Sequence, residues 1–386
     1  MDDSFAPVIN DITIIGKSDS IHIKNFVENV CLPNKYRVTL LTDFNNSFSD
    51  FYSKNGCKIY ASSSSNFFAR IPKLRWLGHL TYIKKNISKI NTELFIIQYV
   101  DYYLMRLFSF IKFNKPFILV FWGSDLYRIS QKRLKRIKYG ITVAQRIVVM
   151  TEDMKRVLSR TFKGAFDDKI IVSDFGNSVL DLIDNNRKEK EFYRNSSFLN
   201  SIANKKVIVT IGYNASRAQN HLQIINAISK IDTEEKKRIF LIFPLSYPKN
   251  SDKYIAKIEK KLKELHFDYL LLCSFMDEDE VSKLCLSTDI FINAQTTDAL
   301  SFSMIEHIYS GNVVWNGGWL TYDFLNNNHI FNKRFGSFTE LQNILGDYQV
   351  DCIRVEKELD KSISIIRNYF SWQSCKKRWE QIINGI

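Results

Sequence analysis

Short apolar runs alternate with longer amphipathic segments along most of the chain. Runs typical of buried strands occupy residues 11–16, 36–43, 57–62, 93–99, 116–123, 146–150 and 168–177. Between the first two runs, residues 20–30 place Ile23, Phe26, Val27 and Val30 on one face of a helix. This alternation predicts βαβ units, and therefore a parallel sheet flanked by helices.

A second series of the same kind follows a polar stretch. Residues 181–205 are polar and weakly periodic, so we expect a domain boundary there. Strand-like runs then occupy residues 205–212, 238–244, 269–275, 289–294 and 312–316, and residues 362–385 have helical spacing. The pattern predicts an α/β fold with two Rossmann-like domains that face each other across a cleft. Their expected ranges are 1–180 and 181–361, with a helix at 362–386 that packs back on the first domain.

Length and charge narrow the class of protein. A chain of 386 residues is too long for one compact core. The formal net charge of +13 favours an anionic partner: nucleic acid, a phosphorylated ligand or an acidic membrane surface. No apolar run approaches the ~20 residues of a membrane span. The six cysteines include no CxxC pair, which argues against a zinc site or a disulfide framework and favours reduced thiols of the cytoplasm.

Two carboxylates flank the start of a predicted helix in the second half. Asp298 follows a strand, and Glu306 lies in the helix "SMIEHIYSG". If that helix begins near Ser303, the free N–H groups of Ser303 and Met304 face a phosphate. Glu306 is then placed to accept hydrogen bonds from a ribose diol, and Asp298 from sugar hydroxyls. The alternative is a capping box formed by Ser303 and Glu306 without a ligand.

Three further positions at strand ends are candidates for binding or catalysis. Gly212 permits close backbone approach, and Arg217 is placed to grip a diphosphate, although a solvated loop arginine is the alternative. In the first half, Asp125 follows Gly123 and Ser124 in a short turn, and it either points into the cleft or caps the next helix. His22 follows the first strand, and it either donates to a ligand or is structural.

Basic and aromatic residues interleave in the first half. Residues 67–86 combine Arg70, Lys73 and Arg75 with Phe67 and Trp76, and residues 132–138 form a second basic run. Such segments suit an anionic lipid surface or single-stranded nucleic acid, and a solvated face over a partly buried seam is the alternative. The acidic run at 276–281 starts a predicted helix, so dipole capping explains it and we predict no metal site there.

Taken together, these positions resemble the GT-B glycosyltransferases, in particular the large retaining family called family 4. That family carries E-x7-E followed by Gly and an apolar strand, and here Asp298-x7-Glu306 precedes Gly311. Residues 144–158 and 170–177 look like its segments before the linker, and 207–228 like its phosphate-binding segment. The sequences "FWGSDLYRIS" and "GYNASRAQNH" also resemble the 4-acetamido-4,6-dideoxygalactose transferases of enterobacterial common antigen assembly.

Three departures from the family pattern stand out. The first glutamate is Asp298, the usual lysine falls near Gln219, where Arg217 offers a substitute, and Trp122 replaces the first-domain histidine. The resemblance implies a retaining glycosyltransferase that needs no metal or other cofactor. It implies donor contacts by Gly212, Arg217, Ser303, Met304 and Glu306, with Asp298 at the donor sugar and His22 and Asp125 on the acceptor side.

The expected partners are a nucleotide-diphosphate sugar and a glycan or lipid-linked acceptor in the synthesis of bacterial surface polysaccharide, such as lipopolysaccharide or capsule. We expect a cytoplasmic protein held at the inner face of the plasma membrane by its anionic lipids. The alternatives are a sugar-nucleotide epimerase on the same fold and a basic nucleic-acid-binding protein. No RNP-like or zinc motif supports the last of these, so we expect no nucleic-acid partner.

Overall fold

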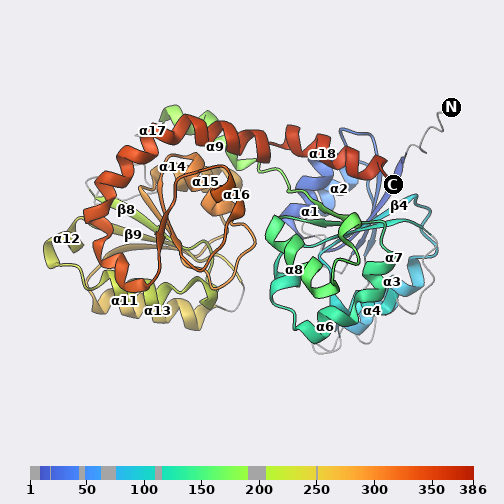
Figure 1. Cartoon of the computed structure of the whole chain (residues 1–386), viewed down its shortest axis with the longest axis horizontal. Coiled ribbons are helices and arrows are strands. Elements are labelled where there is room, and N and C mark those ends of the chain that lie inside the picture. Colours follow the sequence, from blue (N-terminus) through green and yellow to red (C-terminus); the bar gives the residue numbers. More distant parts are fainter. Residues whose placement is uncertain are drawn as a thin grey trace. The chain divides into compact units, whose positions relative to one another are not determined.

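The chain forms two compact units (Figure 1). The computed structural model describes residues 9–17, 19–42, 48–61, 75–108, 115–189, 206–248 and 251–386. The first unit comprises residues 1–176 together with 372–386, and the second comprises 177–371. The chain therefore passes between the units twice, after Gly176 and after Ser371.

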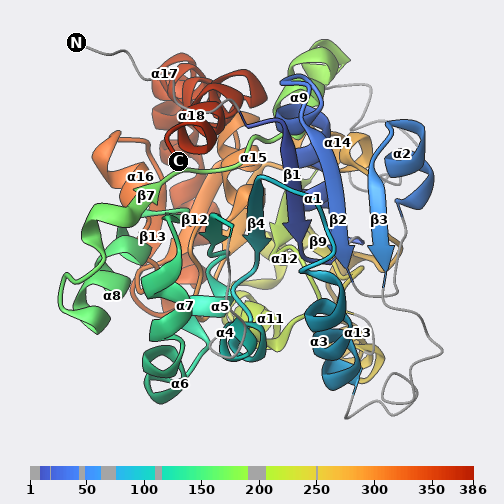
Figure 2. The ribbon, with the colours of Figure 1, turned by 90° about the vertical axis from the view of Figure 1, so that its right-hand side faces the viewer.

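The first unit is built on a parallel sheet of seven strands in the order β3-β2-β1-β4-β5-β6-β7. Figure 2 shows β3, β2, β1 and β4 side by side. The strands are β1 Asp11–Ile15, β2 Arg37–Thr42, β3 Lys58–Ala61, β4 Leu94–Gln98, β5 Phe117–Val120, β6 Arg146–Val149 and β7 Ile170–Val172. Its helices are α1 Ile21–Phe26, a π-helical turn Val27–Cys31, α2 Ser49–Lys54, α3 Arg75–Asn86, α4 Tyr102–Phe108, α5 Ser124–Tyr127, α6 Gln131–Arg136, α7 Lys138–Val143, α8 Glu152–Phe162 and α18 Trp372–Asn384.

The second unit has a parallel sheet of six strands in the order β10-β9-β8-β11-β12-β13. The strands are β8 Val207–Ile211, β9 Ile239–Pro244, β10 Asp268–Leu272, β11 Ile290–Asn293, β12 Val313–Gly317 and β13 Lys333–Phe335. Its α-helices are α9 Val179–Asn186, α11 His221–Ile228, α12 Thr233–Lys237, α13 Asp252–Glu264, α14 Glu278–Ser287, α15 Phe302–Tyr309, α16 Asp323–Asn327 and α17 Ile344–Phe370, with 3-10 turns η6 Arg217–Gln219 and η7 Phe338–Asn343.

Both sheets follow the same winding rule. In each unit the first strand lies inside the sheet, the chain moves outward for two strands, and it then returns to the other side of the first strand. Strand order reverses between β1 and β4 and again between β8 and β11, which is where sheets of this kind bind ligands. The predicted α/β fold with two Rossmann-like domains is confirmed.

Alternating side chains of the second sheet pack into apolar cores on its two faces. Val209, Leu241 and Ile292 face a core shared with α11, α13 and the start of α17. Their neighbours Phe291 and Val314 face the opposite core, which includes α9, α14 and α15. Because both faces are covered, these strands are apolar throughout, which explains why sequence alone located them. The short strand β13, whose Lys333 and Arg334 lack that pattern, was not predicted.

One boundary prediction and one helix prediction need correction. Residues 181–186 belong to α9, which buries Val179, Leu180 and Ile183 against the second unit, so they are not a linker. The predicted helix at 362–385 consists of the end of α17, a break at Ser371, and α18. The long middle of α17 is largely exposed and carries no continuous apolar stripe, which is why its start at Ile344 was missed.

Helix α18 packs on the first unit, as predicted. Trp379 is fully buried, its ring lies 4.8 Å from Phe26 and 5.2 Å from Phe175, and its indole N–H donates to the Asp174 carbonyl oxygen at 3.2 Å. Gly176 meets the ring of Trp372, where any side chain would overlap the indole. The last fifteen residues of the chain therefore complete the first unit's core.

Replacing Trp379 with alanine should destabilise the first unit strongly. A buried tryptophan replaced by alanine typically costs about 3–5 kcal/mol through lost burial and the cavity left behind. Urea unfolding followed by circular dichroism measures this loss. Lys377→Ala, on the exposed side of the same helix, should change the free energy of unfolding by less than about 0.5 kcal/mol. Equal effects of the two substitutions would contradict the packing role of Trp379.

Candidate active site

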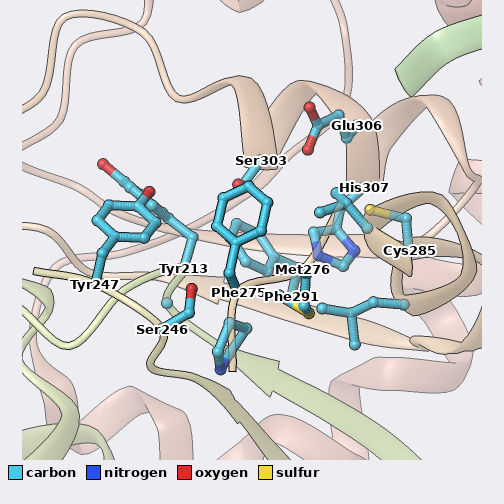
Figure 3. A pocket seen from close by; sticks show the side chains of 14 residues that line it. Tyr213, Ser246, Tyr247, Phe275, Met276, Cys285, Phe291, Ser303, Glu306 and His307 are labelled. Carbon is cyan, nitrogen blue, oxygen red and sulfur yellow. The ribbon is translucent and has the colours of Figure 1, made fainter. Parts of the chain in front are cut away.

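A pocket of about 110 Å³ lies at the carboxyl ends of three strands of the second unit (Figure 3). Its lining comes from the segments after β8, β9 and β10, from α14 and β11, and from the first turns of α15. The residues are Gly212, Tyr213, Pro244, Ser246, Tyr247, Phe275, Met276, Val281, Leu284, Cys285, Phe291, Ser303, Glu306 and His307. The pocket therefore lies at the β8–β11 switch point, and it brings together three predicted donor-site residues: Gly212, Ser303 and Glu306.

Gly212 forms a tight turn after β8 and lines the pocket. It follows β8 directly and has φ +64°, a backbone conformation that strains other residues. A side-chain carbon here would lie 2.9 Å from Gln219 Oε1 and 3.0 Å from His221 Nε2. Only glycine therefore lets the chain turn tightly enough for these two buried side chains to approach it.

Helix α15 begins at Phe302, one residue before the predicted start near Ser303, and its N-cap lies two residues before Ser303. Ser301 is its N-cap, and the Ser301 hydroxyl accepts a hydrogen bond from the Met304 N–H at 3.1 Å. The alternative capping box of Ser303 and Glu306 is therefore wrong. The Met304 N–H, predicted to face a ligand, is occupied by this cap. The Ser303 N–H lies in the first turn, where no carbonyl within the helix can accept it, and Ser303 lines the pocket.

Glu306 is a buried carboxylate held by an amide from the start of the second unit. It is 6% exposed, and its Oε1 accepts a hydrogen bond from Asn177 Nδ2 at 2.9 Å. Burial raises the pKa of Glu306 from 4.5 to about 7. The Asn177 hydrogen bond opposes that rise, and the negative charge of Glu278 adds to it. The carboxylate is thus a buried polar group in the lining of a mainly apolar pocket.

His307 lines the pocket as a neutral hydrogen-bond donor. Its ring stacks on Phe291 with centroids 4.2 Å apart, and burial lowers its pKa to about 3. Asn312 Nδ2 donates to the Cys285 carbonyl oxygen and also lies 2.7 Å from His307 Nδ1. Because that amide nitrogen can only donate, Nδ1 is the acceptor, and we assign the ring proton to Nε2.

Aromatic side chains form the outer part of the pocket. Phe275 is 77% exposed and Tyr247 is 50% exposed, although both line it (Figure 3). Tyr213 is fixed by a hydrogen bond from its hydroxyl to Gln295 Oε1, the same oxygen that accepts from Gln219 Nε2. An exposed phenyl ring beside a buried carboxylate suits a ligand with one planar face and one hydroxyl-bearing part.

Three predicted residues of the second unit lie outside the pocket lining: Met304, whose N–H is bound by Ser301, and also Asp298 and Arg217. Asp298, in the loop after β11, accepts a hydrogen bond from the Tyr322 hydroxyl at 3.0 Å. Arg217 is exposed on the η6 turn, with its guanidinium 5.6 Å from the centre of the Tyr254 ring. Gln219, where the family pattern has lysine, is fully buried and carries no charge.

The predicted residues of the first unit gather around Trp122. The Trp122 ring stacks on Phe175 at 4.4 Å, and the exposed His22 ring lies 4.7 Å from it. Asp125 is buried, and it accepts hydrogen bonds from the N–H groups of Val100 at 2.8 Å and Trp122 at 2.9 Å. Burial raises the pKa of Asp125 to about 6 against these bonds.

The surroundings of Asp125 correct one prediction and show its structural role. The helix N-cap is Gly123, with φ +100°, so the alternative role of Asp125 as a cap is wrong. Each of its carboxylate oxygens accepts a hydrogen bond from a backbone N–H group, so this side chain holds the loop that carries Trp122.

Several lining residues were missed by sequence reasoning. Tyr213, Ser246, Tyr247 and Phe275 each lie within three residues of a strand's carboxyl end, which is the signal that would have found them. No residue type or spacing marks them otherwise. Asn177, the partner of Glu306, was also missed, because an asparagine next to a domain boundary carries no signal of its own.

Two kinds of feature are absent from the part of the chain that the structure describes. No group of three or more His, Cys, Asp or Glu side chains there has an arrangement able to hold a metal ion. Among the helices described, none combines the length and apolar character that crossing a membrane requires.

Comparison with known proteins gives a family match for part of the chain and a fold match for all of it. Residues 11–151 match the family described as Glycosyl transferase 4-like. No curated protein matches the chain by sequence. Many solved structures match in fold, and three of them illustrate the range.

The first of these structures is Anabaena Alr3699/HepE in complex with UDP and glucose, with 11% identity, a TM-score of 0.72, and coverage of 98% of this chain and 100% of that one. A glycosyltransferase from Rickettsia africae has 15% identity, a TM-score of 0.72, and coverage of 97% and 99%. Sucrose-phosphate synthase from Thermosynechococcus elongatus has 13% identity, a TM-score of 0.73, and coverage of 97% and 98%. The predicted GT-B fold and the general class of glycosyltransferase are confirmed.

Replacing Glu306 with glutamine should stabilise the protein at high pH. The folded-state pKa of Glu306 lies above its ordinary value, so its contribution to stability falls as pH rises from about 4.5 to 7. Above pH 7 the full cost of the buried charge is present. We expect Glu306→Gln to melt roughly 2–5 °C higher at pH 8, and close to the wild type at pH 5.

Thermal unfolding at the two pH values measures this difference. The matched control is Glu356→Gln, which removes an exposed carboxylate from α17 and should leave the melting temperature unchanged at both pH values. A lower melting temperature for Glu306→Gln at pH 8 would show that the ionised carboxylate stabilises the fold.

Proposed function

We propose that this protein transfers a sugar from a nucleotide-diphosphate sugar to a glycan or lipid-linked acceptor in the synthesis of bacterial surface polysaccharide. The observation that carries the proposal is the pocket at the β8–β11 switch point. It combines a helix N-terminus, a buried carboxylate and exposed aromatic rings. A nucleoside diphosphate offers matching parts: an anionic diphosphate, a ribose diol and a planar base. The Anabaena complex supports UDP as the first nucleotide to test.

Each part of the nucleotide has a candidate partner. Glu306 accepts hydrogen bonds from the ribose hydroxyls, as a buried carboxylate does best. The Ser303 N–H and the positive end of the α15 dipole favour a phosphate. Phe275 and Tyr247 provide exposed faces for a base to stack on.

The chemical step calls for stabilisation of the leaving diphosphate. Arg217 follows Gly212 by five residues and remains exposed, so its guanidinium is available for a flexible anionic group. Together with helix amides it would supply the positive charge that other enzymes take from a metal ion. We therefore propose a metal-independent reaction. Asp298, fixed by Tyr322, would accept hydrogen bonds from the donor sugar. Retention of anomeric configuration follows the family resemblance.

In this proposal, the first unit binds the acceptor. His22 is exposed beside the Trp122 ring, so these two side chains form a polar and apolar pair suited to a sugar. Asp125 acts by holding the Trp122 loop. The resemblance to transferases of 4-acetamido-4,6-dideoxygalactose favours a lipid-diphosphate-linked acceptor.

Nucleotide binding should depend on the aromatic and carboxylate parts of the pocket. Among UDP, GDP and dTDP, at least one should bind measurably by isothermal titration calorimetry. Phe275→Ala should weaken that binding roughly 5- to 150-fold, because one stacked aromatic contributes ~1–3 kcal/mol per base. The control is Val350→Ala, which trims another exposed apolar side chain, 69% exposed on α17.

The same titrations separate the proposal from its rivals. Binding of single-stranded oligonucleotides with no nucleoside diphosphate binding would favour a nucleic-acid-binding protein. An epimerase would convert the nucleotide sugar without an acceptor, which mass spectrometry of the products detects. If no nucleoside diphosphate binds, the proposed function is wrong.

A peripheral membrane location is part of this proposal. Helices α6 and α7 present five exposed basic residues, at positions 132, 133, 135, 136 and 138, together with Tyr139, which is 46% exposed. Helices α3 and α4 lie at the same end of the unit (Figure 2) and add the exposed Lys84, Lys85 and Arg106. Such a surface suits anionic lipid headgroups. Most of the predicted basic–aromatic segment, residues 67–74, lies outside the described residues.

Anionic vesicles should sediment the protein at low salt. Each basic residue near an anionic surface contributes about 1 kcal/mol, so reversing Lys132, Lys135 and Arg136 to glutamate should abolish co-sedimentation. Reversal of Lys253, Lys257 and Lys260, three exposed lysines of α13, makes the same charge change in the second unit and should have little effect. Equal losses from the two triple variants would show that only net charge matters.

A further inference from the structure

Asn177 is the first residue of the second unit, and three of its polar groups are used within that unit. Its backbone N–H donates to the Phe370 carbonyl oxygen at 2.9 Å. Its Oδ1 accepts from the Val179 N–H at 2.9 Å, and its Nδ2 donates to Glu306 Oε1 at 2.9 Å. The residue is 6% exposed, so these bonds are shielded from water.

The residues bound by Asn177 lie beside both places where the chain passes between the units. Phe370 is the last residue of α17, one residue before the second crossing, and Asn177 directly follows the first. The Phe370 ring also lies 5.9 Å from Phe302, the first residue of α15. The pocket helix α15 therefore contacts the residues at both crossings, once through Glu306 and once through Phe302.

We propose that Asn177 is a positioning residue that orients the Glu306 carboxylate for its ligand and transmits occupancy of the pocket to the two chain crossings. The inference rests on the proposed function, because the ligand is taken to be a nucleoside diphosphate. With Oε1 held by Asn177, the remaining oxygen, Oε2, has no protein partner among the described residues and is the one left for a ribose hydroxyl.

The contact also sets the charge on Glu306. A donor that faces the carboxylate favours its ionised form, which can accept from two hydroxyls at once. The other titratable groups that interact electrostatically with it come from two elements: Glu278 and Cys285 of α14, and Tyr247 in the segment after β9. His307 is its neighbour along α15. Besides these groups, Asn177 donates a hydrogen bond to Glu306, and Asn177 directly follows a chain crossing.

The test compares the pH dependence of nucleotide affinity in the wild type and in Asn177→Asp. This substitution keeps the acceptor for the Val179 N–H and replaces only Nδ2 with oxygen. Wild-type affinity for UDP, or for whichever nucleoside diphosphate binds, should fall as pH is lowered from 8 to 6. In Asn177→Asp the midpoint should move at least about one pH unit higher, with roughly tenfold weaker binding at pH 7.5. An unchanged midpoint overturns the proposal.

A charge-swapped double variant separates orientation from simple structural support. Asn177→Asp combined with Glu306→Gln restores a hydrogen bond with the donor and acceptor exchanged. The melting temperature should recover relative to Asn177→Asp, whereas nucleotide affinity should stay low because no carboxylate is left at position 306. Recovery of affinity together with stability would show a purely structural role. Failure of stability to recover would show that the two side chains are not paired.

Hydrogen exchange at the Asn177 amide tests transmission to the crossings. This N–H donates to Phe370, so saturating nucleotide should slow its exchange about threefold or more in the wild type and leave it unchanged in Glu306→Gln. Equal exchange with and without nucleotide overturns that part of the proposal. A wild type that binds no nucleotide overturns the proposed function instead, and the stability of the charge-swapped variant still decides whether the pair exists.

Discussion

Parallel strands end at the same edge of a sheet, and this constraint decides where a site can form in this protein. Both sheets are parallel throughout and wound in the same order, so every segment that leaves a carboxyl end begins at one edge. Backbone groups there have no ladder partner, which gives them freedom to bind ligands. Residues that follow three strands line the pocket of the second unit, because the parallel topology starts all three of these segments at the same edge of the sheet.

Burial of a polar group in an apolar setting costs free energy, and this cost explains how the side chains around the pocket are paired. A buried amide or carboxyl without a partner is costly, and several polar side chains around the pocket are paired with one another. Gln295 accepts from Tyr213 and Gln219, while its own amide donates to the Thr297 carbonyl oxygen at 2.6 Å. Asn312 fixes His307 in the same way. Tyr213 and His307, two of the side chains that reach the cavity, are thus held before any ligand arrives, which lowers the cost of ordering them on binding.

Sequence patterns predicted the sheets because burial on both faces makes the strands continuously apolar. They placed Gly212, Ser303 and Glu306 near one edge because a glycine after a strand indicates a tight turn, and the next helix starts at that same edge. The patterns failed where the three-dimensional path of the chain decides which of several suitable residues makes a contact. Ser301 and Ser303 are both good caps, and only the path of the loop after β11 decides that Ser301 binds the Met304 N–H. Asp125 has the right residue type for catalysis, but its oxygens are bound by backbone N–H groups that no pattern reveals. Phe275 and Tyr247 carry no spacing signal, so only the folded loops bring them together.

The discontinuity of the first unit has a consequence for how the chain is made. A ribosome releases residues in order, and residues 177–371 emerge as one uninterrupted stretch that can fold by itself. The first unit starts earlier but must wait for α18, whose Trp379 packs against both Phe26 and Phe175. Until α18 is made, the first unit lacks the Trp379 contacts with Phe26 and Phe175, whereas the second unit needs no segment after Ser371. The half of the protein that is translated first is the half that matures last.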